Sequence, residues 1–164
     1  MPEVPYEFPD RINRAFRKKG VGWQLVNGEI QVRGPEEFEH ALTAAAALAA
    51  KSNRDTARAE LHEARLGLSR MPAPDVTGAI THAMAALECV ARDLTGQQGL
   101  TLGDWLKRNP TAFPPPLDAA VGKLWGYASE YGRHVREGRV ASYEEGELVV
   151  GVAASLTAYL LRKV

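Results

Sequence analysis

With 164 residues, the chain can bury a core of its own, so it needs neither a disulfide nor a metal ion to fold. Twenty Lys and Arg residues balance twenty Asp and Glu residues, which excludes a bulk electrostatic attraction to nucleic acid. Cys89 is the only cysteine, and this excludes an internal disulfide and a CxxC metal site.

The N-terminal residues lack the basic-then-apolar order of a secretory signal peptide. The longest apolar run, residues 44–50, is much shorter than the ~20 residues that cross a bilayer. We therefore expect a cytoplasmic protein with no membrane association.

The first predicted elements are a short helix and a β-hairpin. Ile12 and Phe16 lie four residues apart between basic residues, which predicts an amphipathic helix over 9–19 that ends at Gly20. Residues 23–26 and 29–32 flank Asn27-Gly28, the pair that best tolerates the positive φ angles of a type I′ turn. A two-stranded ribbon is marginal in water, so we expect it to lean on a helix.

Residues 35–70 are rich in Ala, Leu, Glu and Arg and predict a long helical region. Pro35 suits the first turn, and Lys51-Ser52-Asn53 indicates a break into two helices. The stretch 71–74, Met-Pro-Ala-Pro, ends the region. We therefore predict two units, an N-terminal module over 1–70 and a helical bundle over 71–164.

In the second unit, the sequence predicts a helix over 75–94, a short helix after Thr101 and a helix from Leu117. A polar loop over 132–140 and a last helix follow. Ser142 and Glu145 have the spacing of a capping box that opens this last helix. The predicted fold is mainly α, an up-and-down bundle preceded by a helix and a two-stranded ribbon. Apolar residues at helical spacing predict its core: Ile80, Leu87, Leu124, Leu148, Val152 and Leu156.

Three segments of the bundle stand in a notable order: PDVTGAITHAMAALE over 74–88, TLGDWL over 101–106 and LWGYASEYGRH over 124–134. Together they resemble the HEPN-type helical domain of AbiJ-like abortive-infection proteins. The hairpin sequence GVGWQLVNGEI, residues 20–30, is similar to the hairpin that precedes such domains in one AbiJ-like subgroup. The resemblance covers most of the chain.

This resemblance implies a role in phage defence or a stress response, commonly as a homodimer. HEPN proteins include metal-independent ribonucleases and non-catalytic relatives that bind RNA or nucleotides. Catalytic members carry an Arg four to six residues before a His. The corresponding positions before His134 hold Tyr127, Ala128 and Ser129, and the neighbouring arginine is Arg133. A catalytic role, if the chain has one, falls on Arg133 and His134.

Arg33 and His40 do have the six-residue gap of this motif. They lie where the hairpin meets the first long helix, outside the predicted bundle. With this many arginines in the chain, we interpret the match as a coincidence of composition.

The polar loop concentrates cations. Arginine grips phosphate through two hydrogen bonds, and histidine titrates near neutral pH. The loop therefore predicts a site for RNA or nucleotide; the alternative is a solvated loop whose charges pair with nearby glutamates. The predicted binding residues are Arg133, His134, Arg136 and Arg139.

Glu88 stands between Leu87 and Cys89 in an otherwise apolar helix. Because a buried carboxylate requires a partner, it is predicted to reach Arg133 or His134 and support the site. An i,i+4 ion pair with Arg92 on the helix surface is the alternative. The four histidines do not form a metal-binding pattern, and no cofactor is predicted.

The leading hypothesis is therefore a HEPN-type protein that binds RNA or a nucleotide through the Arg/His loop, as a degenerate ribonuclease or a non-catalytic relative. The alternative is a non-catalytic module that binds a protein partner through the hairpin and the alanine-rich helix.

Overall fold

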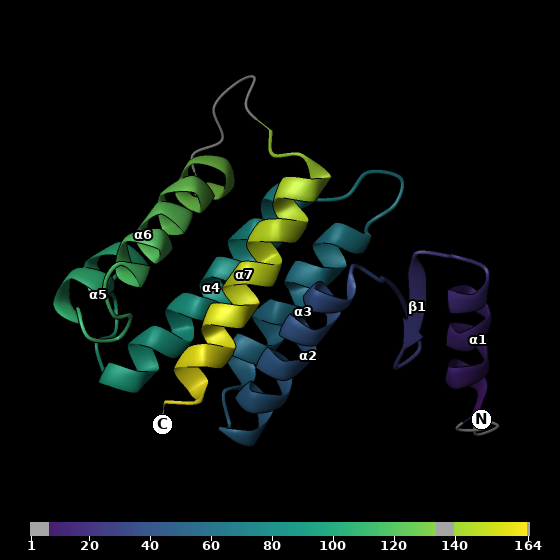
Figure 1. Ribbon diagram of the computed structural model, residues 1–164, viewed down its shortest axis with the longest axis horizontal. Helices are drawn as coiled ribbons and strands as arrows, with labels where there is room; N and C mark the ends of the chain where they lie inside the picture. The colour runs from purple at the N-terminus through teal and green to yellow at the C-terminus, as the bar shows by residue number, and fades with distance from the viewer. Residues whose placement is uncertain (1–6, 134–139, 164) are drawn as a thin grey trace.

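The computed structural model of the protein describes residues 7–133 and 140–163. The described chain is mainly α-helical with one two-stranded antiparallel hairpin, which confirms the predicted fold class (Figure 1). No helix among the described residues is long and apolar enough to cross a membrane.

The N-terminal segment forms an arm of three elements, α1 (Glu7–Lys18), β1 (Trp23–Val26) and β2 (Glu29–Val32). The hairpin has the predicted turn, because Asn27 and Gly28 both have positive φ, at 51° and 84°. The strands pair from Trp23 opposite Val32 to Val26 opposite Glu29. We refer to residues 7–32 as the arm.

The alanine-rich region forms two helices, α2 (Glu36–Lys51) and α3 (Asp55–Ser69), with the break where it was predicted. Asn53 has a φ of 55° in this break, a conformation that asparagine tolerates better than most residues. Next, α4 (Val76–Thr95) begins at Asp75, whose carboxylate accepts a hydrogen bond of 2.8 Å from the Gly78 amide.

The bundle continues with α5 (Leu102–Arg108), α6 (Leu117–Ala128), a π-helical turn η1 (Ser129–Arg133) and α7 (Tyr143–Leu161). The predicted capping box opens α7. The Glu145 amide donates to the Ser142 hydroxyl at 3.2 Å, and the Ser142 amide donates to the Glu145 carboxylate at 2.7 Å.

The helices α2, α3, α4 and α7 pack around one hydrophobic core, with α7 against both α2 and α4. Helices α5 and α6 pack on α4 at the opposite side of the molecule from the arm (Figure 1). Helices from both predicted units, 1–70 and 71–164, therefore contribute to this core. The boundary between two units at residue 70 stays a prediction.

The predicted core residues separate into two groups. Ile80 and Leu87 are fully buried, and Leu124 and Leu156 are half-buried against the core. The prediction was wrong for Leu148 and Val152, which are 65% and 36% exposed. Helix α7 is apolar on more than one face, so helical spacing alone could not identify the face that packs. The face that does pack carries small and β-branched residues: Val149, Val150, Ala153, Ala154, Thr157 and Ala158.

Leu87→Ala should lower the free energy of unfolding by ~2–5 kcal/mol, because it removes a fully buried side chain and leaves a cavity. Leu148→Ala is the matched control and should change it by no more than about 0.5 kcal/mol, because Leu148 is exposed. Urea denaturation of the two variants measures both effects. Equal losses would contradict the observed orientation of α7.

Candidate functional site

The predicted Arg/His site lies at the junction of α6 and α7. Arg133 is the last residue of η1, which packs against α4 and α6. His134, Arg136 and Arg139 lie outside the described residues, as does the side chain of Arg133. The chain therefore enters the predicted site from a helical turn fixed on the bundle, and the assignment of these four residues stays a prediction.

Glu88, the predicted supporting residue, is buried at the centre of α4 and holds two neighbouring helices. Its Oε1 accepts hydrogen bonds from the Leu102 amide at 3.1 Å and from the Trp125 indole at 3.4 Å. Its Oε2 accepts one from Arg92 at 2.9 Å. The i,i+4 pair with Arg92 is thus present, but the carboxylate lies in the interior and not on the surface. One side chain joins α4 to the start of α5 and to α6.

Glu88→Ala should lower the free energy of unfolding by about 1–3 kcal/mol, because it leaves buried N–H groups without an acceptor. Glu88→Gln keeps one acceptor oxygen and should cost less. Urea denaturation followed by tryptophan fluorescence measures the stability of both variants. If Glu88→Ala matched the parent, the carboxylate would not be a structural link.

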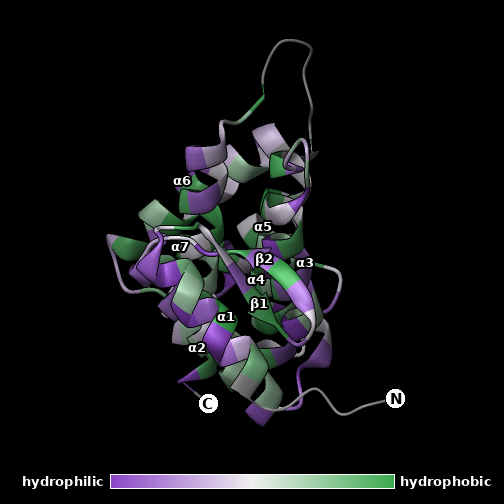
Figure 2. Cartoon of the chain, turned by 90° about the vertical axis from the view of Figure 1, so that its right-hand side faces the viewer, coloured by the Kyte–Doolittle hydropathy of each residue, from purple (hydrophilic) through white to green (hydrophobic). Residues whose placement is uncertain are grey.

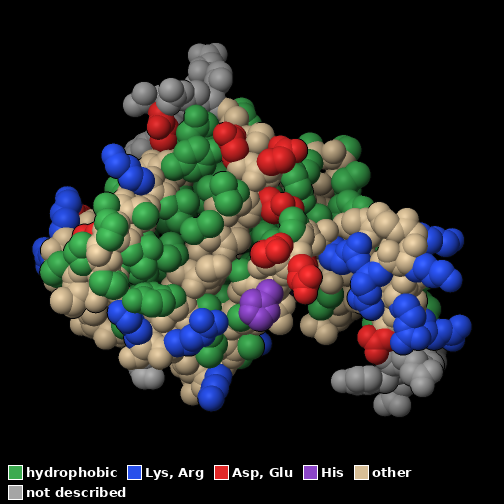
Figure 3. All heavy atoms as spheres, viewed as in Figure 1, with side chains coloured by type: hydrophobic (Ala, Val, Ile, Leu, Met, Phe, Trp, Pro, Cys, Tyr) green, Lys and Arg blue, Asp and Glu red, His purple; other side chains and the backbone are tan. Residues whose placement is uncertain are grey.

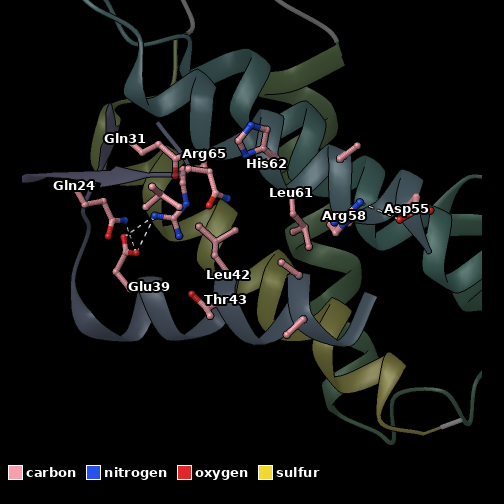
Figure 4. Close-up of a pocket in the computed structure, with 15 residues that line it drawn as sticks. Gln24, Gln31, Glu39, Leu42, Thr43, Asp55, Arg58, Leu61, His62 and Arg65 are labelled. Atoms are coloured by element: carbon pink, nitrogen blue, oxygen red, sulfur yellow. Dashed lines mark hydrogen bonds and ion pairs between the residues drawn. The ribbon is translucent and has the colours of Figure 1, made fainter. Parts of the chain in front are cut away.

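A cavity of about 630 Å³ lies between the hairpin and the helices α2 and α3 (Figure 4). The strands alternate, so that Trp23 and Leu25 share one face and Gln24 and Val26 share the other. It is the second face, together with the buried Gln31, that lines the cavity. The hairpin therefore turns its more polar face toward the helices.

A network of hydrogen bonds fixes the hairpin above α2 and α3. The Arg65 guanidinium forms an ion pair with Glu39 at 2.8 Å and lies 5.7 Å from the centre of the Phe38 ring. The Gln24 amide donates to the same carboxylate at 2.9 Å, and Arg65 also donates to the Val32 carbonyl at 3.3 Å. Figure 4 shows Gln24, Glu39 and Arg65 converging from β1, α2 and α3.

The remaining charged residues of the cavity are also paired. Arg58 contacts Asp55 at 3.1 Å, and His62 contacts Glu29 at 3.3 Å. Each Arg and His side chain that the structure describes around the cavity thus has a carboxylate partner. A phosphate group would have to displace such a carboxylate. The lining therefore favours a small neutral ligand, with an apolar part and a group that hydrogen-bonds to the glutamine amides. The apolar wall is formed by Leu42, Ala46, Ala47, Ala59 and Leu61.

Sequence reasoning missed this cavity. Alternation in the hairpin did carry a signal, since Gln24 and Gln31 are on one face of the ribbon and lie opposite each other. The helix that would meet that face was not predictable, because Glu39 and Arg65 lie 26 positions apart, on two different helices.

Glu39→Ala should loosen the hairpin, because Arg65 and Gln24 lose their shared acceptor. Charged hydrogen bonds contribute about 1.5–3 kcal/mol, so hydrogen exchange of residues 23–32 should speed up by roughly 10- to 100-fold. Glu36→Ala, an exposed acid at the start of the same helix, is the control and should leave exchange unchanged. Equal exchange in the two variants would show that the network does not hold the hairpin.

Comparisons of the chain with protein-family models, with characterised proteins and with solved structures found no match. The likeness to HEPN proteins therefore rests on the sequence segments. Within residues 7–133 and 140–163, no three His, Cys, Asp or Glu side chains group closely enough to hold a metal ion.

Proposed function

We propose that this protein is a non-catalytic, HEPN-type binding protein that takes RNA or a nucleotide through residues 133–139. It acts in the cytoplasm in phage defence or a related stress response. The observation that carries the proposal is the concentration of Arg133, His134, Arg136 and Arg139 directly after η1. Cleavage is left out of the proposal because the bundle lacks an Arg four to six residues before His134.

The fixed surroundings of the loop support this proposal. The π-helical turn η1 packs on α4, the helix that carries the buried Glu88, and π-helical turns occur often at functional sites. The hairpin cavity is a poorer place for a phosphate, since the described cations around it are paired with carboxylates.

A second candidate function, binding of a protein partner, is favoured by a different observation. Leu148 and Val152 are exposed on α7 beside the alanine-rich α2. No apolar side chain described in α1, β1 or β2 is buried, and Ile30 and Phe8 are 53% and 47% exposed. Contiguous exposed apolar surface marks contact sites in soluble proteins, and Leu148 and Val152 are adjacent on one face of α7.

Arg133→Ala combined with His134→Ala should abolish binding of a short single-stranded RNA or of ATP, measured by fluorescence anisotropy at low salt. Three arginines and one histidine predict a shallow dependence on salt, with a slope no steeper than about −3 for single-stranded RNA. The melting temperature should stay close to that of the parent, because neither substitution removes an apolar side chain.

Arg33→Ala combined with His40→Ala is the matched control, since it removes the same two residue types outside residues 133–139 and should leave binding unchanged. The proposal would be wrong if the parent bound no ligand at low salt, or if the 133/134 variant bound as tightly as the parent. Metal-independent cleavage of RNA that His134→Ala stops would overturn the non-catalytic assignment.

A further inference from the structure

A groove of about 290 Å³ runs between α2 and α7 on the surface of the bundle. Its floor is apolar and contains Leu148, Gly151 and Val152 from α7, with Phe38 and Ala41 from α2. Its rim is acidic and consists of Glu37, Glu144 and Glu147. Figure 3 shows a run of acidic side chains on this face, between the apolar surface and the Lys and Arg side chains of the arm.

The acidic rim lacks a cation among the described residues. None of its three glutamates forms a described ion pair. Burial raises the pKa of Glu147, and the nearby carboxylates of Glu144 and Glu39 raise it further. The pKa of the Tyr143 hydroxyl is raised in the same way, by burial and then by Glu147 and Glu144. The groove thus has an apolar floor and a rim that a basic partner would stabilise.

The arm carries the complementary surface. Arg11, Arg14 and Lys18 follow each other at spacings of three and four residues, so they form one exposed stripe along α1 with Ala15 inside it. The described residues supply no ion-pair partner for these cations. The ribbon of α1 carries several hydrophilic residues in Figure 2.

Helix α1 lies apart from the groove of its own chain, with α2 and α3 between α1 and α7 (Figure 1). The Val32 amide donates to the Ser69 hydroxyl at 2.8 Å, which fixes β2 on α3. The Asn13 side chain then fixes α1 to β1, since it accepts from the Leu25 amide at 2.7 Å and donates to the Leu25 carbonyl at 2.8 Å. The hairpin and α1 are thus attached on the α3 side of α2, whereas the groove lies between α2 and α7 and begins at Pro35.

We propose that the basic stripe of α1 docks in the α2–α7 groove of a second copy of this chain, and that the exchange is reciprocal. Reciprocal docking closes a two-fold dimer, the commonest form of homo-oligomer. Arg11, Arg14 and Lys18 would meet the acidic rim, and their aliphatic stems would cover the apolar floor. If the groove of one copy packed against the groove of another, two acidic rims would face and repel each other. This inference rests on the second candidate function, partner binding, and names the partner.

The test is a charge exchange, followed by analytical ultracentrifugation of the full chain over a range of concentrations at low salt. Arg11→Glu with Arg14→Glu should weaken dimerisation at least tenfold, and Glu37→Lys with Glu144→Lys should do the same. Combining the four substitutions restores opposite charges and should recover most of the affinity. Salt should weaken the parent dimer, because it screens exposed charges.

Arg108→Glu with Lys123→Glu, two exposed cations on α5 and α6, is the matched control and should leave the dimer intact. Circular dichroism and melting temperature identify any variant that fails to fold. If one double variant is misfolded, recovery of dimerisation in the fourfold variant still tests the pairing of the two surfaces. A parent that stays monomeric would overturn the proposal. A dimer that resists both charge reversals and is lost with Leu148→Asp would overturn it too, in favour of groove-to-groove packing. The ultracentrifugation contains no RNA, so a negative result would not bear on RNA binding. RNA binding is tested separately by fluorescence anisotropy.

Discussion

Close packing of alanine-rich helix faces determines how the rest of this molecule is arranged. The core positions of α2, α4 and α7 are repeatedly alanine, and side chains this small let helix backbones approach closely. Helix α7 fits between α2 and α4 by turning Ala153 and Ala154 inward, and both are fully buried. Its larger residues Leu148 and Val152 then remain outside. The groove between α2 and α7 follows directly from this choice of face.

Two buried or nearly buried carboxylates attach the peripheral elements to that core. Glu88 accepts hydrogen bonds from α5 and α6, and Glu39 binds Arg65 and the hairpin residue Gln24. In both places a polar group is stabilised by partners from other elements, because an unpaired charge in the interior would cost several kcal/mol. The arm in particular is held by hydrogen bonds more than by apolar burial, since Gln31 is its only buried residue among those that the structure describes.

The two proposed functions use opposite properties of the surface. The proposed RNA or nucleotide binding would use the basic residues that follow η1 in the sequence. Partner binding depends on an acidic, apolar groove and on a basic arm that lies apart from it. The net charge of zero thus conceals a separation of charge between the arm and the groove. Such a separation suits a chain that recognises a second copy of itself, because each copy supplies both complementary surfaces.

Local signals in the sequence were enough to predict the hairpin, the helix break near Asn53, the capping box at Ser142 and the mainly helical class. Each depends on the conformational preferences of a few adjacent residues, such as the positive φ of Asn27 and Gly28. The apolar spacing also placed Ile80 and Leu87 correctly in the core. The tertiary structure alone decided which face of α7 is buried, because that helix is apolar on several sides. It also decided that Glu88 faces inward and that Glu39 meets Arg65, since those contacts join helices whose packing no local pattern specifies.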